Sequence, residues 1–165
     1  MRRLTLTTLA FRATLVGLLI VVYTTAWRPA RTWVASHIIQ PALQSISESP
    51  QRVRSRGVSV FVRPNPSQPT STVGFRTPSG ILFLLPACLL LFGFPYRPYW
   101  IYLWIYQMSL GLLMIVSIGI GLRGFVWGFP LYHFLSGRVY MGTSLAAPLV
   151  AFWVEKQRDR ASPPS

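Results

Sequence analysis

Polar side chains stand at the ends of the apolar segments between positions 77 and 138, and several are of types that bind anions or move protons. Arg123 directly follows a long uncharged run, and a guanidinium can hold a carboxylate or a phosphate through two parallel hydrogen bonds. His133 can exchange protons near neutral pH, and Ser79 carries a hydroxyl that could act as a nucleophile. The sequence therefore offers Arg123, His133 and Ser79 as candidate catalytic residues, and Arg123 with Arg138 as candidate ligand-binding residues.

The two ionisable candidates also have ordinary structural explanations. An arginine directly after an apolar span is commonly an anchor to lipid headgroups. A histidine within an aromatic segment at the membrane interface is commonly structural, and the sequence places no carboxylate nearby to orient His133. Both explanations stay open beside the chemical ones for Arg123 and His133.

The few cysteine and acidic residues argue against several other kinds of site. Cys88 is the only cysteine, so an intramolecular disulfide is impossible and a thiolate metal cluster would lack ligands. The only acids are Glu48, Glu155 and Asp159, and none lies within an apolar span. This distribution argues against a proton-coupled pump or a carboxylate-based cation site. We expect no metal and no cofactor.

The segments that must position these residues are apolar enough to cross a membrane. Pro98–Leu122 is a run of 25 residues without a charge, and a helix of that length crosses the roughly 30 Å hydrocarbon core. The chain is 52% hydrophobic and only 12% charged. We therefore expect an all-α membrane protein with about four transmembrane helices. The expected spans are Thr5 to Trp27, Ser79 to Phe94, Tyr99 to Leu122 and Val139 to Val154.

The ends of the chain and one connection complete this organisation. The first span, within an anchor at residues 1–27, is expected to stay uncleaved, although its basic start also resembles a signal peptide. Residues 79–154 form the expected three-span bundle, in which Gly124 to Gly137 is interpreted as a re-entrant or interfacial connection. Residues 155–165 are predicted to be a disordered basic tail.

Residues 28–78 form the one sizeable polar region. Apolar residues from Val34 to Ile46 recur at helical spacing, which predicts an amphipathic helix that lies on the membrane surface or continues the first span, with Pro41 bending it. A basic patch follows at 51–56. Beyond it, alternation over 58–63 and a second run at 71–76 predict a small β-hairpin at the membrane edge.

Chain topology is expected to bring the candidate residues together. The tight, proline-containing turn at 94–99 makes the second and third spans antiparallel neighbours, which places Gly80 and Arg123 at the same depth. One face would then carry the hairpin and the following polar residues: Thr77, Ser79, Arg123, His133, Ser136 and Arg138. Small residues at Ser117 and Gly121, and again from Gly142 to Ala151, predict two faces for close helix packing.

The charge of the chain points to a lipid partner. Sixteen Lys and Arg against three Asp and Glu give a net charge of +13. The arginines flank apolar spans rather than gathering with exposed aromatics, so we expect a bilayer with anionic headgroups and no nucleic acid as partner. Four spans place both termini on one side. The positive-inside rule slightly favours the reverse, but the arginines before the first span favour cytoplasmic termini in a bacterial-type inner membrane.

Three short motifs resemble the core of the exosortase and archaeosortase family. They are Pro78-Ser79-Gly80-Ile81 at the start of a span, Arg123 at the end of the next, and His133 to Gly137 just beyond. The resemblance implies a polytopic membrane transpeptidase that cuts C-terminal sorting tails with a cysteine, an arginine and a further His or Arg. Pro78 occupies the position of the nucleophilic cysteine, and Cys88 lies too deep along the helix to replace it.

These observations leave three functional hypotheses. The first is a non-catalytic accessory or assembly component of a membrane protein-sorting or envelope system, with a membrane protein partner or a second copy of itself. The second is an exosortase-like peptidase or transpeptidase that uses Arg123 and His133. The third is a transport subunit that binds anionic lipid through Arg123 and Arg138.

Overall fold

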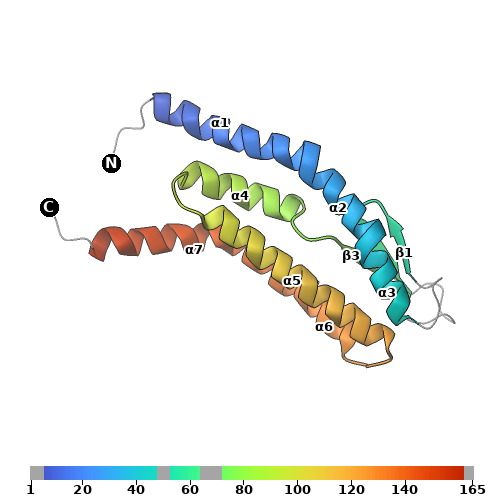
Figure 1. Ribbon diagram of the computed structural model, residues 1–165. Helices are drawn as coiled ribbons and strands as arrows, with labels where there is room; N and C mark the ends of the chain where they lie inside the picture. Colours follow the sequence, from blue (N-terminus) through green and yellow to red (C-terminus); the bar gives the residue numbers. More distant parts are fainter. Residues whose placement is uncertain (1–5, 48–52, 64–71, 162–165) are drawn as a thin grey trace.

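The computed structural model describes residues 6–47, 53–63 and 72–161, which form a bundle of long helices with a small sheet at one end (Figure 1). Its helices and strands are α1 (Leu6–Val22), α2 (Arg28–Val34), α3 (Gln40–Ile46), β1 (Val53–Arg56), β2 (Ser59–Val62), β3 (Val73–Arg76), α4 (Ile81–Gly93), α5 (Tyr99–Leu122), α6 (Gly128–Phe134) and α7 (Tyr140–Ala161). The fold is therefore mostly helical, as expected, with one small sheet.

The N-terminal helices join into one continuous run, Leu6–Ile46, of 41 residues. A helix of that length extends about 60 Å, twice the thickness of the hydrocarbon core. π-helical turns at Tyr23–Trp27 and Ala35–Ile39 link its three parts, and Pro29 and Pro41 each lie two residues beyond the end of a turn. Proline lacks the N–H that a regular turn requires, and the wider turn accommodates this loss. The sequence predicted that the amphipathic helix either lies on the membrane surface or continues the first span. In the structure it continues the first span.

The predicted hairpin is part of a three-stranded antiparallel sheet in the order β1-β2-β3. The described part of the basic patch predicted at 51–56 forms the strand β1, Val53–Arg56. Val53 is buried and pairs with Val62, while Arg54 and Arg56 are exposed. Buried and exposed residues alternate in β1 as they do in the other strands. The sequence does not reveal this alternation, because Val53 is the only apolar residue of the strand. The predicted hairpin turn, residues 64–70, lies outside the described residues.

Two further predictions about the C-terminal half are corrected. The proposed connection at 124–137 is helical from Gly128, and a π-helical turn at Leu135–Val139 joins α6 to α7 without a break. A Cβ atom on Gly128 would lie 2.3 Å from the backbone nitrogen of Gly121, so α6 packs directly on the predicted small-residue face of α5. The tail is helical as far as Ala161, with basic residues in its last turn where they favour the helix dipole. Residues 162–165 lie outside the described part.

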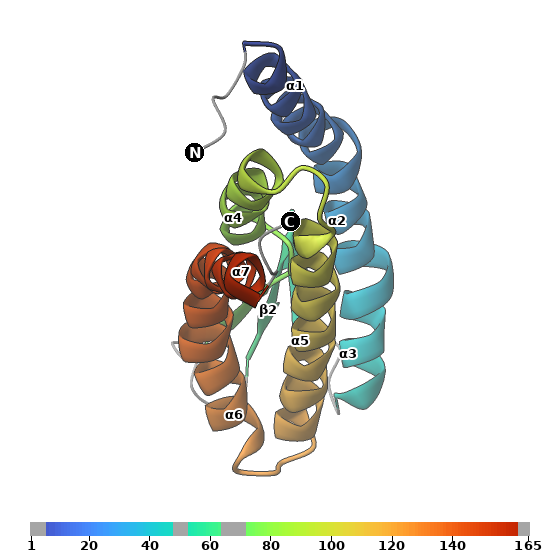
Figure 2. The same cartoon turned by 90° about the vertical axis from the view of Figure 1, so that its left-hand side faces the viewer.

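The helices run back and forth along one axis. The first residues of α1 and the last residues of α7 lie at one end of the molecule, and α3 and the sheet lie at the other (Figure 1). In the view turned by 90°, α4 lies between α1 and α7, and it also packs against α5 (Figure 2). One core joins the sheet to α3, α5 and α6 around Phe75 and Ile118, and a second joins α4, α5 and α7 around Phe83 and Leu90.

Two helices in the described part of the chain are long and apolar enough to cross a membrane, the N-terminal run and α5. The apolar helix α4 has only 13 residues, so it extends about 20 Å. It begins at Ile81 and ends at Gly93, within the predicted span from Ser79 to Phe94. Helix α5 has the predicted bounds.

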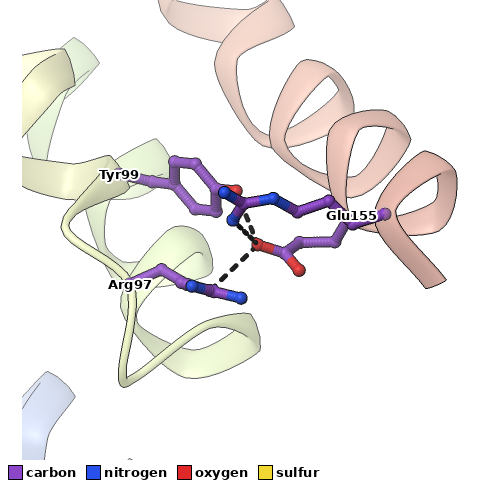
Figure 3. A network of polar contacts seen from close by, with 4 residues as sticks. Arg97, Tyr99 and Glu155 are labelled. Carbon is purple, nitrogen blue, oxygen red and sulfur yellow. Dashed lines mark hydrogen bonds and ion pairs between the residues drawn. The ribbon is translucent and has the colours of Figure 1, made fainter. Parts of the chain in front are cut away.

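A cluster of polar side chains fixes the end of the bundle that carries the termini. Tyr99 donates a hydrogen bond of 2.6 Å to Glu155, and Arg97 and Arg158 lie 3.1 and 3.7 Å from the same carboxylate oxygen (Figure 3). These contacts join the turn before α5 to α7, just beyond the last expected span. The hydrogen bond from Tyr99, assisted by the two arginines, holds the pKa of Glu155 below its usual value.

This lowered pKa makes a pH-dependent contribution to stability. Because Glu155 binds protons less readily in the folded state, its contribution is complete above the ordinary glutamate pKa of about 4.3 and is lost as the pH falls through the folded value. We expect the melting temperature of the wild-type chain to exceed that of Glu155→Gln at pH 7, and the difference to be smaller at pH 3. Lys156→Gln, an exposed neighbour, serves as control. An equal difference at both pH values would contradict this assignment.

Candidate functional site

The start of α4 lies against the middle of α5, not against its end. Ser79 is completely buried, and its Oγ lies 3.7 Å from Sδ of Met108. A Cβ atom on Gly111 would lie 2.4 Å from Cγ of Pro78, so these two segments are in direct contact. Ser79 has φ +57°, which is rare for a residue with a side chain. The hydroxyl of Ser79 is therefore enclosed by protein.

Arg123 lies far from this point. It caps the C-terminus of α5 and is exposed, and twelve residues separate it from Gly111, about 18 Å along the helix. The prediction that Gly80 and Arg123 share one depth is therefore wrong. The two predicted spans, 79–94 and 99–122, already differ in length, and in the structure α4 has 13 residues and α5 has 24, so the start of α4 cannot reach the end of α5.

The remaining predicted residues also stay apart. His133 and Arg138 are exposed on α6 and on the turn that follows it, and the His133 ring contacts Tyr132. Since Gly128 packs beside Gly121 and α6 runs back along α5, His133 and Arg123 are separated by about 10 Å along the helix axis. Ser136 Oγ is directed to the backbone oxygen of His133. The structure does not bring Ser79, Arg123 and His133 into one catalytic group.

Another arginine is buried where the N-terminal run meets the segment between β3 and α4. Arg31 of α2 is only 7% exposed. Its Nη2 donates to the backbone oxygen of Thr77, and its Nη1 lies 3.2 Å from the hydroxyl of Tyr23. Nearby, the indole nitrogen of Trp27 donates to the backbone oxygen of Ser79. These contacts attach the N-terminal run to the junction between β3 and α4.

Arg31 borders a cavity of about 310 Å³ that we call the Arg31 pocket. Its other lining residues come from the sheet, from the start of α4 and from α7: Val58, Ser59, Arg76, Thr77, Gly80, Ile81, Leu82 and Tyr140. A second cavity of about 200 Å³ shares Arg76, Leu82 and Tyr140 with the first and extends toward Met114. A Cβ atom on Gly80 would lie 3.1 Å from Nη2 of Arg31, so the glycine leaves room for the guanidinium.

A buried polar network supports the floor of the Arg31 pocket. Gln107 of α5 is completely buried and donates a 2.8 Å hydrogen bond to Ser144 of α7. Tyr140 donates a 3.2 Å hydrogen bond to the side-chain oxygen of Gln107, and Ser144 Oγ donates to the backbone oxygen of Tyr140. In an apolar surrounding, such mutually bonded groups hold helices in one register. The network therefore fixes Tyr140 at the pocket wall.

Sequence reasoning missed Arg31 because it stands three residues after Arg28 and resembles a second headgroup anchor. A signal was nevertheless present. Tyr23, Trp27 and Arg31 are spaced by four residues, which places two polar-tipped aromatics and one arginine on the same face of a helix. The spacing does not identify the residue that this face contacts, Thr77, which lies 46 residues further along the chain.

Comparison of the chain with protein-family models, with curated proteins and with solved structures gives no match.

Proposed function

We propose that the chain is a four-span integral membrane protein that acts as a non-catalytic accessory or assembly component of a membrane protein-sorting or envelope system. Membrane insertion is supported by large apolar side chains that face outward on successive helices. Leu6 is 86% exposed and Leu149 is 73% exposed, and they belong to the first and the last helix. A bilayer covers such faces, whereas water would not.

The back-and-forth path supports four crossings. The N-terminal run, α4, α5 and the joined α6–α7 helix each pass along the same axis (Figure 1). Helix α4 is short for a complete span and begins beside the middle of α5, so headgroups reach the polar residues before it only where the bilayer thins around this helix. In this arrangement the termini share one side, which we propose is the cytoplasm, and the sheet lies on the other. Reporter fusions after Gln68 and after Ser165 test this orientation.

The separation of Ser79, Arg123 and His133 is the observation that favours an accessory role over an enzyme. A covalent mechanism requires a nucleophile within hydrogen-bond reach of its base, and the enclosed Ser79 does not meet this requirement. We therefore expect the double variant Arg123→Ala with His133→Ala to keep the cellular phenotype of the wild type. Loss of that phenotype in a stably folded double variant would support the exosortase-like alternative instead.

A partner is supported by the open end of the second small-residue face. The first face, at Ser117 and Gly121, is occupied within the chain by α6, and Ala147 and Ala151 of the second pack against α4 and α5. At the other end of the second face, a Cβ atom on Gly142 would meet nothing within 4 Å. We expect crosslinking in native membranes, followed by purification, to yield a complex with another membrane protein or with a second copy. Gly142→Leu should lower the yield of this complex, whereas Gly137→Leu, at an equally open glycine, should not. A chain recovered strictly alone would overturn the accessory proposal.

A further inference from the structure

We propose that the Arg31 pocket binds a phosphate group, carried by the head group of an anionic lipid or present as free phosphate. The inference rests on the proposed membrane location and concerns a site that includes neither Arg123 nor Arg138. Four features of the described residues carry it: an uncompensated buried charge, a second guanidinium, the N-terminus of α4 and the position of the cavity beside a lipid-facing stripe.

The first feature is the unpaired charge of Arg31. Its side chain is more than nine-tenths buried, and Nε, which is itself buried, has no hydrogen-bond partner. The two hydrogen bonds that its Nη atoms make go to a neutral hydroxyl and a backbone oxygen. Glu155, the acid whose side-chain contacts the structure describes, is bound to Arg97 and Tyr99 at the opposite end of the bundle. A buried guanidinium without an anion is costly, and a bound anion would remove that cost.

The second and third features place further anion-binding groups around the same cavity. Arg76 of β3 lines it from the exposed side of the sheet, together with Ser59. Helix α4 begins there, and its N-cap residue Gly80 has no side-chain hydrogen bond to the first turn. The first N–H groups of a helix lack intrahelical partners and stand at the positive end of its dipole. Two arginines and the first residues of a helix therefore line one cavity.

Size and charge favour phosphate over a lone carboxylate. The cavity of about 310 Å³ is larger than one carboxylate requires, and two guanidinium groups match the charge and the several acceptor oxygens of a phosphate.

The fourth feature identifies the source of the phosphate that the structure favours. Ile81 lines the cavity and is 77% exposed, and Leu85 and Leu89 continue from it at intervals of four residues, both exposed. Residues with this spacing form one stripe along a helix. The stripe faces outward from the bundle, and the Arg31 pocket lies at its end. A lipid whose acyl chains lie along α4 would thus place its headgroup phosphate in the pocket.

The purified full chain is kept in a neutral detergent and titrated with three ligands. They are dihexanoyl phosphatidylglycerol, dihexanoylglycerol, which lacks the phosphate, and inorganic phosphate. Binding is measured by calorimetry and by the rise in melting temperature. We expect the phospholipid to bind and dihexanoylglycerol not to bind. Arg76→Gln, which changes an exposed residue, should weaken binding by about tenfold or more, as should Arg31→Gln if that variant folds. Gly80→Ala should also weaken it, because its methyl group would displace the guanidinium of Arg31.

Matched controls separate the pocket from the general positive charge of the chain. Arg54→Gln changes an exposed arginine of the same sheet outside the pocket, and Arg123→Gln changes the arginine that the sequence favoured. Neither should alter binding by more than about twofold at fixed ionic strength. Glu48→Gln should also leave binding unchanged, and tighter binding in this variant would identify Glu48 as the counter-ion and overturn the proposal.

Each outcome of the titration decides the proposal. If the phospholipid binds and Arg76→Gln weakens this binding, the lipid is supported as the source of the phosphate. If inorganic phosphate alone binds and Arg76→Gln weakens that binding, the same site is supported with a soluble ligand. Binding that is unchanged in Arg76→Gln, or that falls equally in Arg54→Gln, overturns the site. The absence of a protein partner in the crosslinking experiment would leave this titration unaffected, so the two proposals can fail independently.

Discussion

Replacing Gly128 with alanine is expected to lower the free energy of unfolding by about 3 kcal/mol, because the new methyl group would overlap backbone atoms. A Cβ atom at this position would lie 2.3 Å from the nitrogen and 2.7 Å from Cα of Gly121, and 2.7 Å from the backbone oxygen of Ser117. None of these atoms can rotate away, so α6 must separate from α5. The change is measured by denaturant unfolding of the detergent-solubilised chain.

Gly142→Ala is the matched control for this prediction. Gly142 also lies in a helix, but a Cβ atom there would meet nothing within 4 Å. Because alanine restricts the unfolded chain more than glycine does, this variant is expected to gain about 0.5–1 kcal/mol. Equal stabilities of Gly128→Ala and Gly142→Ala would show that the close contact between α5 and α6 does not exist in solution.

The parts of the fold that were predicted are those in which composition alone decides the structure. Helix α5 has the predicted bounds because an uncharged run between Pro98 and Arg123 has one clear start and one clear end. The alternation of Val58, Val60 and Val62 likewise identified β2. In both cases a local pattern determines the element, so no tertiary information was required.

The errors arise where tertiary contacts decide the local structure. Gly128 and Pro130 look like turn residues in the sequence, yet Gly128 is the residue that lets a helix pack closely on Gly121. The basic residues after Val154 look like a solvated tail, yet the contacts of Glu155 with Tyr99 and Arg97 hold that segment as a helix. Single-sequence patterns do not contain these partners.

The candidate site was missed for a geometric reason. The prediction aligned Arg123 with Gly80 by assuming that antiparallel helices begin and end together, and the short α4 breaks that assumption. Arg31 reaches Thr77 only because the N-terminal run continues as a helix through the π-helical turn at Tyr23–Trp27. The sequence already indicated a shorter second span and left the continuation open as one of two placements, but it does not show that Arg31 contacts Thr77.

Phe75→Ala is expected to produce the largest loss of stability, about 3–5 kcal/mol, together with loss of phosphate binding. Phe75 is only 1% exposed and contacts the ring of Tyr132, whose hydroxyl donates a 2.6 Å hydrogen bond to the backbone oxygen of Gly74. This side chain attaches β3 to the helices. Because Arg76 and Thr77 directly follow it, a loosened β3 also displaces two walls of the Arg31 pocket.

Phe61→Ala on the neighbouring strand provides the matched control. Phe61 is 39% exposed and lies over Gly74 on the other face of the sheet, so its removal should cost about 1 kcal/mol and leave the pocket intact. Phe75→Leu keeps most of the buried volume. Its free energy of unfolding and its phosphate affinity should therefore lie between those of Phe75→Ala and Phe61→Ala. If Phe75→Ala unfolded the whole chain, Phe75→Leu would still test whether phosphate affinity falls together with the stability of the sheet. Full phosphate affinity in a clearly destabilised Phe75→Leu would show that the sheet does not position the pocket.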